Sequence, residues 1–512
     1  MSMSDKEISV GKPELPPTSQ SPNEVSDQPA QRVQRQHQWK LGEAINLIIG
    51  AGIFIAPGNI WRLVRSPGHA LIFWIVGGLI KLYSFFVWKL SEKGQFDSNI
   101  YGFAFDHQLF KFLFGFATVN IIIPGAIIAN SFVASKYLLY AIQGAEGQEF
   151  NHYGKYYGSY FDKDFIALRF LAVAILGIIT AYHMFTIRNR YENYSICLNQ
   201  ILVVFKVASL LVFAIMGFFK ANDPVFLPTI NNNWHEMFNS TIFNNYSSSG
   251  STFGGYGNAM LQVLYSYEGW NHLSYSSEEL IIEGEYRKYS VLVRVCFSFV
   301  LYILVNIAFI LIVDPKVVAD PNNANESIAI DYGIKLYGDF GRKYMSYLIA
   351  ISSFSSMDSM VLLSSICFEE FKYIPKVHEV LFARSQASYR NLFAQFVYCA
   401  IIIIIFPAVN VFAFFSEMSE YLIMLIYGAS ACYLIYKRIN NSHHKMYLPI
   451  FVLCLMFIII APLFPIPSSE SVKFKYPYII PFIISLLAIL VIEFLKRIKV
   501  IEETTTAPQL PN

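Results

Sequence analysis

The chain has 512 residues, of which 55% are hydrophobic and 14% charged, and its mean hydropathy is +0.43. A soluble domain carries about 25% charged residues, so this composition excludes a soluble protein and indicates many membrane-spanning segments. The formal net charge of +2 gives no indication of nucleic-acid binding, and the sequence contains no basic arm or finger motif.

Residues 1–38 are polar and rich in Ser, Pro, Gln and Glu, which is typical of a disordered tail. No apolar core that could serve as a cleavable signal peptide precedes the first predicted span. We expect the transmembrane domain to cover residues 39–498 and a second polar tail to follow over 499–512.

The apolar stretches predict an all-α membrane protein with about twelve transmembrane helices. They lie at roughly residues 41–64, 70–90, 108–140, 164–185, 195–218, 257–280, 290–313, 343–368, 391–409, 411–437, 447–464 and 477–496. An even span count places both termini on one side, and the moderate bias of Lys and Arg indicates the cytoplasm. The plasma membrane is the expected location, and a vacuolar membrane with the same topology is the alternative.

The first span contains Gly50, Gly52, Pro57 and Gly58, which interrupt a helix. In hydrocarbon, unpaired backbone groups are tolerated only where they are buried in protein or line a polar cavity. We therefore expect a broken helix whose bare amides and carbonyls form a binding site at mid-membrane depth, as in secondary transporters.

The sixth span is interrupted by Glu268, Gly269, Asn271 and His272. A charged group at the bilayer centre costs a few kcal/mol and by default marks a functional site. The alternative is that Glu268 forms an ion pair with a buried partner such as Lys206 and only fixes packing.

Breaks in the first and sixth spans are expected if spans 1–5 and 6–10 form a five-plus-five inverted repeat. A broken helix presents amide groups where one half-helix begins and carbonyls where the other ends. These two groups suit the carboxylate and the ammonium of a zwitterion, so the arrangement predicts an amino acid as ligand.

Asn239, Asn245 and Asn325 head N-x-S/T triplets in loops that this topology places outside the cytoplasm, and they are predicted glycosylation sites. All six cysteines fall within predicted spans, so no structural disulfide is expected. The histidines lack metal-ligand spacing and no nucleophile elbow or phosphate loop is present, which argues against an enzyme, a metal site or a cofactor.

Two stretches carry a resemblance to a known family. Residues 49–58, IGAGIFIAPG, resemble the first-span signature of the amino acid–polyamine–organocation superfamily. Residues 265–273, YSYEGWNHL, are similar to the sixth span of its L-type amino acid transporter branch, to which fungal methionine permeases are close relatives. Weaker matches follow in order, so that the resemblance covers roughly residues 40–495.

The resemblance implies the roles of particular residues in this chain. The amides around Gly50, Ala51, Gly52 and Ile53 would hold the substrate carboxylate. The carbonyls of Tyr265, Ser266 and Glu268 would hold its ammonium. The rings of Trp270 and Tyr265, with Phe54, would shape the side-chain pocket or the gate, and ordinary helix packing is the alternative for these aromatic residues.

Lys206 lies in the middle of the fifth span, where family members carry a lysine. The resemblance implies a tether between the first and eighth spans, with Ser355 and Ser356 as eighth-span partners and Asp358 further along. The tether would stand where sodium-driven carriers hold a cation, which argues for sodium independence. An ion pair of Lys206 with Glu268 or Asp358 is the competing hypothesis.

The chain also departs from the family. Glu268 stands where relatives usually have glycine, and its carboxylate could accept a coupled proton or attract a cationic side chain. The turns that family members carry after the second and eighth spans are missing from residues 88–97 and 368–372, which puts the inner gate in doubt. Residues 141–163 contain no cysteine, so no disulfide-linked heavy chain is expected as a partner.

These observations predict a secondary active transporter for amino acids with neutral, large or methionine-like side chains. A carrier of cationic amino acids or polyamines is the first alternative, because of Glu268. The second is an amino-acid sensor on the same scaffold that binds its ligand without moving it, because of the altered gate regions.

Overall fold

A computed structural model describes residues 45–92, 116–143, 163–189, 192–220, 223–244, 252–270, 284–320, 327–370, 388–406, 411–436 and 447–464. Over these ranges the chain forms helices joined by turns, which confirms the predicted all-α membrane protein. Both predicted tails, Asn245, Asn325, the twelfth predicted span and residues 93–97 and 371–372 of the two altered gate stretches lie outside the described residues.

The described helices follow the predicted spans. They are α2 (Gly52–Val64), α3 (Pro67–Glu92), the π-helical turn η1 (Thr118–Ile122), α6 (Ile123–Gln143), α7 (Lys163–Asn189), α8 (Glu192–Lys220), α9 (Leu227–His235), α10 (Thr241–Asn244), α11 (Phe253–Ser266), α12 (Gly284–Ile312), α13 (Pro315–Ala319), α14 (Ile328–Glu370), α16 (Ser388–Ile405), α17 (Val411–Tyr436), α18 (Tyr447–Ile460) and the 3₁₀ turn η5 (Ala461–Leu463). Eight helical segments within the described ranges are long and apolar enough to cross a membrane. They match the first five predicted spans, the seventh, the eighth and the tenth. The count of twelve stays a prediction.

Helices at matching positions in the two predicted halves pack against each other. The first span, which includes α2, contacts α11 of the sixth, and α3 contacts α12. In the same way α6 contacts α14, and α7 contacts α16. Neighbours across a two-fold axis would pair in this way, so the packing is the one that an inverted repeat of five spans predicts.

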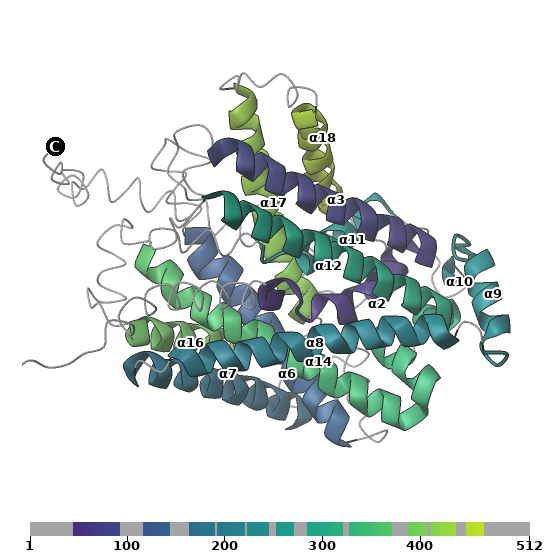
Figure 1. The fold of residues 1–512 in the computed structure, drawn as a ribbon, viewed down its shortest axis with the longest axis horizontal. Coiled ribbons are helices and arrows are strands. Elements are labelled where there is room, and N and C mark those ends of the chain that lie inside the picture. The colour runs from purple at the N-terminus through teal and green to yellow at the C-terminus, as the bar shows by residue number, and fades with distance from the viewer. Residues whose placement is uncertain are drawn as a thin grey trace, which may run out of the picture.

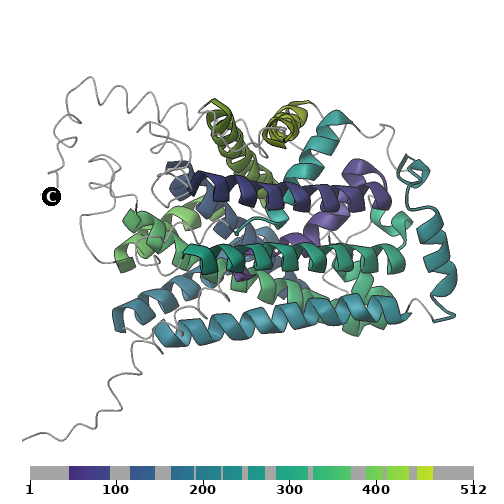
Figure 2. The ribbon, with the colours of Figure 1, turned by 45° about the horizontal axis from the view of Figure 1, so that its top comes forward.

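The long helix α14 contains a sharp bend near its start. Tyr337 and Gly338 leave helical geometry, with φ of −138° and +58°, so that a short first segment precedes the membrane helix. Figures 1 and 2 show α9 lying across one end of the long helices α8 and α12. The short helix α9 therefore crosses the bundle at the end where α8 finishes.

Asn239 lies in the turn between α9 and α10, and its side chain is exposed. Its Oδ1 accepts hydrogen bonds from the backbone N–H and the Oγ1 of Thr241, at 2.9 and 2.8 Å. The residue is therefore accessible, and the third residue of its triplet is bonded to it.

We expect Asn239 to be glycosylated when the chain is made in a eukaryotic secretory pathway. Asn239→Gln should then run faster on a gel than the unchanged chain, by the mass of one glycan. The difference should vanish after treatment with a glycosidase that removes N-linked glycans. An identical mobility of the two chains before treatment would count against glycosylation at this residue.

Candidate functional site

The first predicted break lies between a helical turn at residues 45–48 and α2. Ile49, Gly50 and Ala51 form the bend, and α2 begins at Gly52. The N-cap residue is Ala51, whose methyl group cannot accept a hydrogen bond, so no side chain caps this helix. The first N–H groups of α2 and the positive end of its dipole are therefore available to an anion.

The second predicted break follows α11. Thr252 begins this helix by accepting the N–H of Gly255 at 3.1 Å, and the helix ends at Ser266 in a turn over residues 267–270. The N–H of Glu268 bonds the carbonyl of Tyr265 at 3.0 Å, which leaves the later carbonyls beyond the helical ladder. The carboxyl end of α11 thus presents partial negative charge.

The two breaks touch each other at glycines. Gly269 has φ of +109°, and a Cβ placed on it would lie 2.6 Å from the carbonyl carbon of Leu47. A Cβ on Gly52 would lie 2.6 Å from Oγ of Ser266 and 3.0 Å from its Cα. Glycine is required at both positions, because any side chain would push the broken helices apart.

A cavity lies where the breaks meet, and six of the eight predicted substrate-binding residues line it. These are Gly50, Ala51 and Gly52 from the first break and Tyr265, Ser266 and Glu268 from the second. The turn η1 and the helices α6, α14 and α17 supply the facing wall. Its polar side chains are Asn130, Ser356 and Ser419, and its apolar side chains are Ile122, Ile123, Ala126, Met360 and Ile423.

Ile53 and Trp270 lie outside this lining. Ile53 is fully buried in α2. The Trp270 ring packs against Phe85 and Tyr427, with centroids 6.2 and 6.3 Å apart. Trp270 therefore contributes to the packing behind the second break.

Lys206 of α8 reaches the first break. Its Nζ lies 2.5 Å from the carbonyl oxygen of Ile49 and 3.4 Å from that of Asn46, and its side chain is fully buried. The Oγ of Ser355 donates to Oδ1 of Asn46 at 2.7 Å. Lys206 and Ser355 thus meet at Asn46, whereas Ser356, the other predicted partner, lines the cavity.

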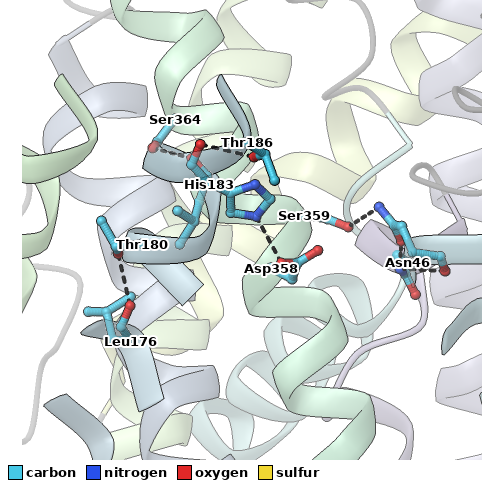
Figure 3. A network of polar contacts seen from close by, with 10 residues as sticks. Asn46, Leu176, Thr180, His183, Thr186, Asp358, Ser359 and Ser364 are labelled. Atoms are coloured by element: carbon cyan, nitrogen blue, oxygen red, sulfur yellow. Dashed lines mark hydrogen bonds and ion pairs between the residues drawn. The ribbon is translucent and has the colours of Figure 1, made fainter. Parts of the chain in front are cut away.

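The polar network continues from Asn46 into the neighbouring helices. The Asn46 amide donates to Oδ1 of Asn199, whose own amide donates to Oγ of Ser359 at 3.2 Å. Figure 3 shows Asp358, the preceding residue of α14, facing the ring of His183 on α7, with 2.8 Å between Oδ1 and Nε2. In the structure the partner of Asp358 is therefore His183 and not Lys206.

Glu268 has a partner that the sequence analysis missed. The Nζ of Lys81 on α3 bonds Oε2 of Glu268 and lies 2.6 Å from Oε1 of Glu420 on α17. Lys81 and Glu420 are fully buried, and Glu268 is 6% exposed. We call these three residues the charge cluster. Lys206 therefore forms neither of the ion pairs that the competing hypothesis considered.

Another buried carboxylate, Glu417, lies three residues before Glu420 on α17. Oε1 of Glu417 on α17 accepts a hydrogen bond of 2.8 Å from the amide of Gln262 on α11. Lys81, Glu417 and Glu420 share a signal that could have identified them, because each is an ionisable residue inside an apolar span.

Comparison with known proteins identifies the family of this chain. A family model described as "Amino acid permease" matches residues 42–488. Among curated proteins, the chain is 26% identical over 334 residues to the large neutral amino acids transporter small subunit 2 of Mus musculus, which covers 64% of this chain and 56% of that one. It is 22% identical over 460 residues to the high-affinity methionine permease of Saccharomyces cerevisiae, which covers 86% of this chain and 74% of the permease.

A third similar protein is amino acid transporter protein 6 of Caenorhabditis elegans. The identity is 23% over 323 residues, or 62% of this chain and 55% of that one. The chain thus spans about half the length of the first curated relatives that it matches. All three relatives are named as transporters or permeases of amino acids.

Proposed function

Because the chain belongs to the amino acid permease family, we propose that it is a secondary active transporter that moves amino acids across a membrane by alternating access. One observation carries the proposal: the uncapped start of α2 and the carboxyl end of α11 face one cavity. Their dipoles present opposite partial charges of about half an elementary charge each. A zwitterion matches both ends at once.

In this proposal the substrate carboxylate binds the N–H groups at Ala51 and Gly52, beside Gly50, whose own N–H donates to the carbonyl of Ile48 at 3.1 Å. Its ammonium binds near the carbonyls of Ser266 and Glu268. Because the backbone makes these contacts, they recognise any α-amino acid in the same way. Lys206 keeps the first break in register by donating to the carbonyl of Ile49.

The remaining wall of the cavity supports a neutral, large or methionine-like substrate. Five apolar side chains, among them Met360 and Ile423, line it. Burying the side chain of a leucine or a methionine against such a wall contributes about 1.5–3 kcal/mol. Two relatives are named for large neutral amino acids and for methionine. A cationic amino acid or a polyamine is less well matched, since Lys81 already pairs with Glu268.

The proposal includes a multi-pass protein of the plasma membrane, with both tails in the cytoplasm. It needs no cofactor other than a coupled proton. Since residues 141–163 contain no cysteine, the carrier works without a disulfide-linked heavy chain.

The test is uptake of labelled leucine into proteoliposomes that contain the purified chain, with and without an inward proton gradient. Unlabelled amino acids and polyamines compete in parallel. Saturable uptake that methionine and other large neutral amino acids inhibit is the expected result. Binding without any uptake would contradict transport and favour the sensor.

Glu268→Gln is expected to make uptake independent of the proton gradient. Two buried carboxylates share one ammonium in the charge cluster, so a proton that enters with the substrate would balance the charge of the cluster. Uptake by the unchanged chain should therefore rise as the external pH falls. The variant should show a flat profile over the same range.

The groups that face Glu268 are Lys81 of α3, Glu420 of α17 and the Tyr265 side chain of α11, which lines the same cavity. Glu417→Gln is the control, because it removes a buried carboxylate of α17 that bonds Gln262 and not Lys81. It should keep the pH profile. A profile in Glu268→Gln like that of the unchanged chain would show that Glu268 carries no coupled proton.

A further inference from the structure

We propose that Lys81 determines the charge selectivity of the cavity. Its ammonium neutralises Glu268 from behind, so that the cavity accepts amino acids with uncharged side chains and excludes those with a second positive charge. The inference rests on the proposed function, because it names the substrate class of the same cavity.

The order of the groups supports this role. Glu268 lines the cavity, whereas Lys81 and Glu420 lie outside its lining. Lys81 Nζ contacts one oxygen of each carboxylate and lies 5.9 Å from the centre of the Tyr427 ring. The ammonium therefore sits deeper than Glu268 as seen from the cavity, between two carboxylates that attract it.

The hydrogen-bonding capacity of Glu268 supports the same conclusion. Its Oε2 accepts from Lys81, and its Oε1 is buried without a hydrogen-bond partner among the described residues. One oxygen thus remains for a ligand, which the α-ammonium of any amino acid can use. A cationic side chain on the same ligand would find no second carboxylate in the lining, because Glu420 is fully buried, bonds Lys81 and lies outside the lining.

Removal of Lys81 would reverse the charge selectivity of the cavity. Without the ammonium, Glu268 would be a carboxylate at the cavity wall that has lost its cationic partner. A buried charge without a partner is unfavourable, and a cationic side chain would replace the lost lysine. Loss of Lys81 should therefore create a preference for arginine and lysine.

Two double variants with equal formal charge test the proposal. Lys81→Gln/Glu420→Gln keeps the carboxylate of Glu268, which lines the cavity. Lys81→Gln/Glu268→Gln keeps the carboxylate of Glu420, which lies outside the lining. Binding of labelled arginine to the purified proteins is measured, together with labelled leucine. We expect the first variant to bind arginine at least tenfold more tightly than the unchanged chain, and the second to bind it no better.

Equal arginine binding by the two double variants, whether strong or absent, would overturn the proposal. So would arginine binding by the unchanged chain that matches its leucine binding. If a double variant is not monodisperse, arginine binding is measured with the single variant Glu420→Gln. This variant keeps the Lys81–Glu268 pair and should therefore exclude arginine. Arginine binding by that variant would overturn the proposal. Absence of leucine binding by the unchanged chain would instead contradict the proposed function.

Discussion

Gly52→Val is expected to abolish amino acid uptake, with a loss of more than about a hundredfold. Already the first carbon of the new side chain would lie 2.9 Å from Cβ and 3.0 Å from Cα of Ser266, so the start of α2 would have to move away from the end of α11. The cavity between the two helix ends would widen and lose its fit to a zwitterion. Uptake of labelled leucine by proteoliposomes with equal amounts of monodisperse protein measures the effect.

A rescue and a control make this prediction specific. Gly52→Ala should also fail, and Gly52→Ala/Ser266→Gly should recover part of the uptake, because the second change removes the two closest atoms. Gly50→Ala should be tolerated better, since its Cβ would meet the side chain of Ser356 at 3.0 Å rather than a backbone atom. Equal losses in Gly50→Ala and Gly52→Ala, without rescue, would contradict the steric argument.

Lys206→Met is expected to reduce uptake about ten- to hundredfold while the chain remains folded. The methionine fills a similar volume but leaves the carbonyls of Ile49 and Asn46 without the lysine donor. An unsatisfied buried acceptor costs about 1–3 kcal/mol, and each 1.4 kcal/mol corresponds to about a factor of ten. The first break then loses the contact that holds it to α8.

Lys220→Met is the control for this variant because it removes a lysine from the exposed end of the same helix. Lys220 pairs with Asp223 at 2.9 Å in a partly exposed position, where an ion pair contributes little. Its uptake should match that of the unchanged chain. An equal decrease in both variants would show that loss of a lysine from α8, and not loss of the tether, causes the effect.

Much of the fold could be predicted from the sequence, because its signals are local. Apolar stretches of sufficient length predicted the spans, and Gly50, Gly52 and Gly269 predicted the two breaks. The structure explains why Gly52 and Gly269 are glycines. A Cβ added to either residue would lie within 3.0 Å of a backbone atom of the other break. The contact joins residues more than 200 positions apart, which no local pattern reveals.

The partners of the buried charges could not be predicted for the same reason. Glu268 is 187 residues from Lys81, and Lys81 is 339 residues from Glu420. Each of these residues can be recognised as an ionisable residue within an apolar span, but the sequence does not show which of them form ion pairs. Lys206 was therefore considered with Glu268 and Asp358, although the described structure pairs these carboxylates with Lys81 and His183.

The charge cluster also restricts how this chain can change during evolution. Lys81 lies on α3, Glu268 in the turn after α11 and Glu420 on α17. Loss of Lys81 alone would leave two buried carboxylates without their shared partner, whereas loss of one carboxylate leaves a balanced pair. Related chains should therefore gain or lose these residues in balanced combinations. In an alignment of near relatives, an uncharged residue at the position of Lys81 should be accompanied by an uncharged residue at the position of Glu268 or Glu420. The three positions would then form one inherited unit, although they are scattered across 340 residues of sequence.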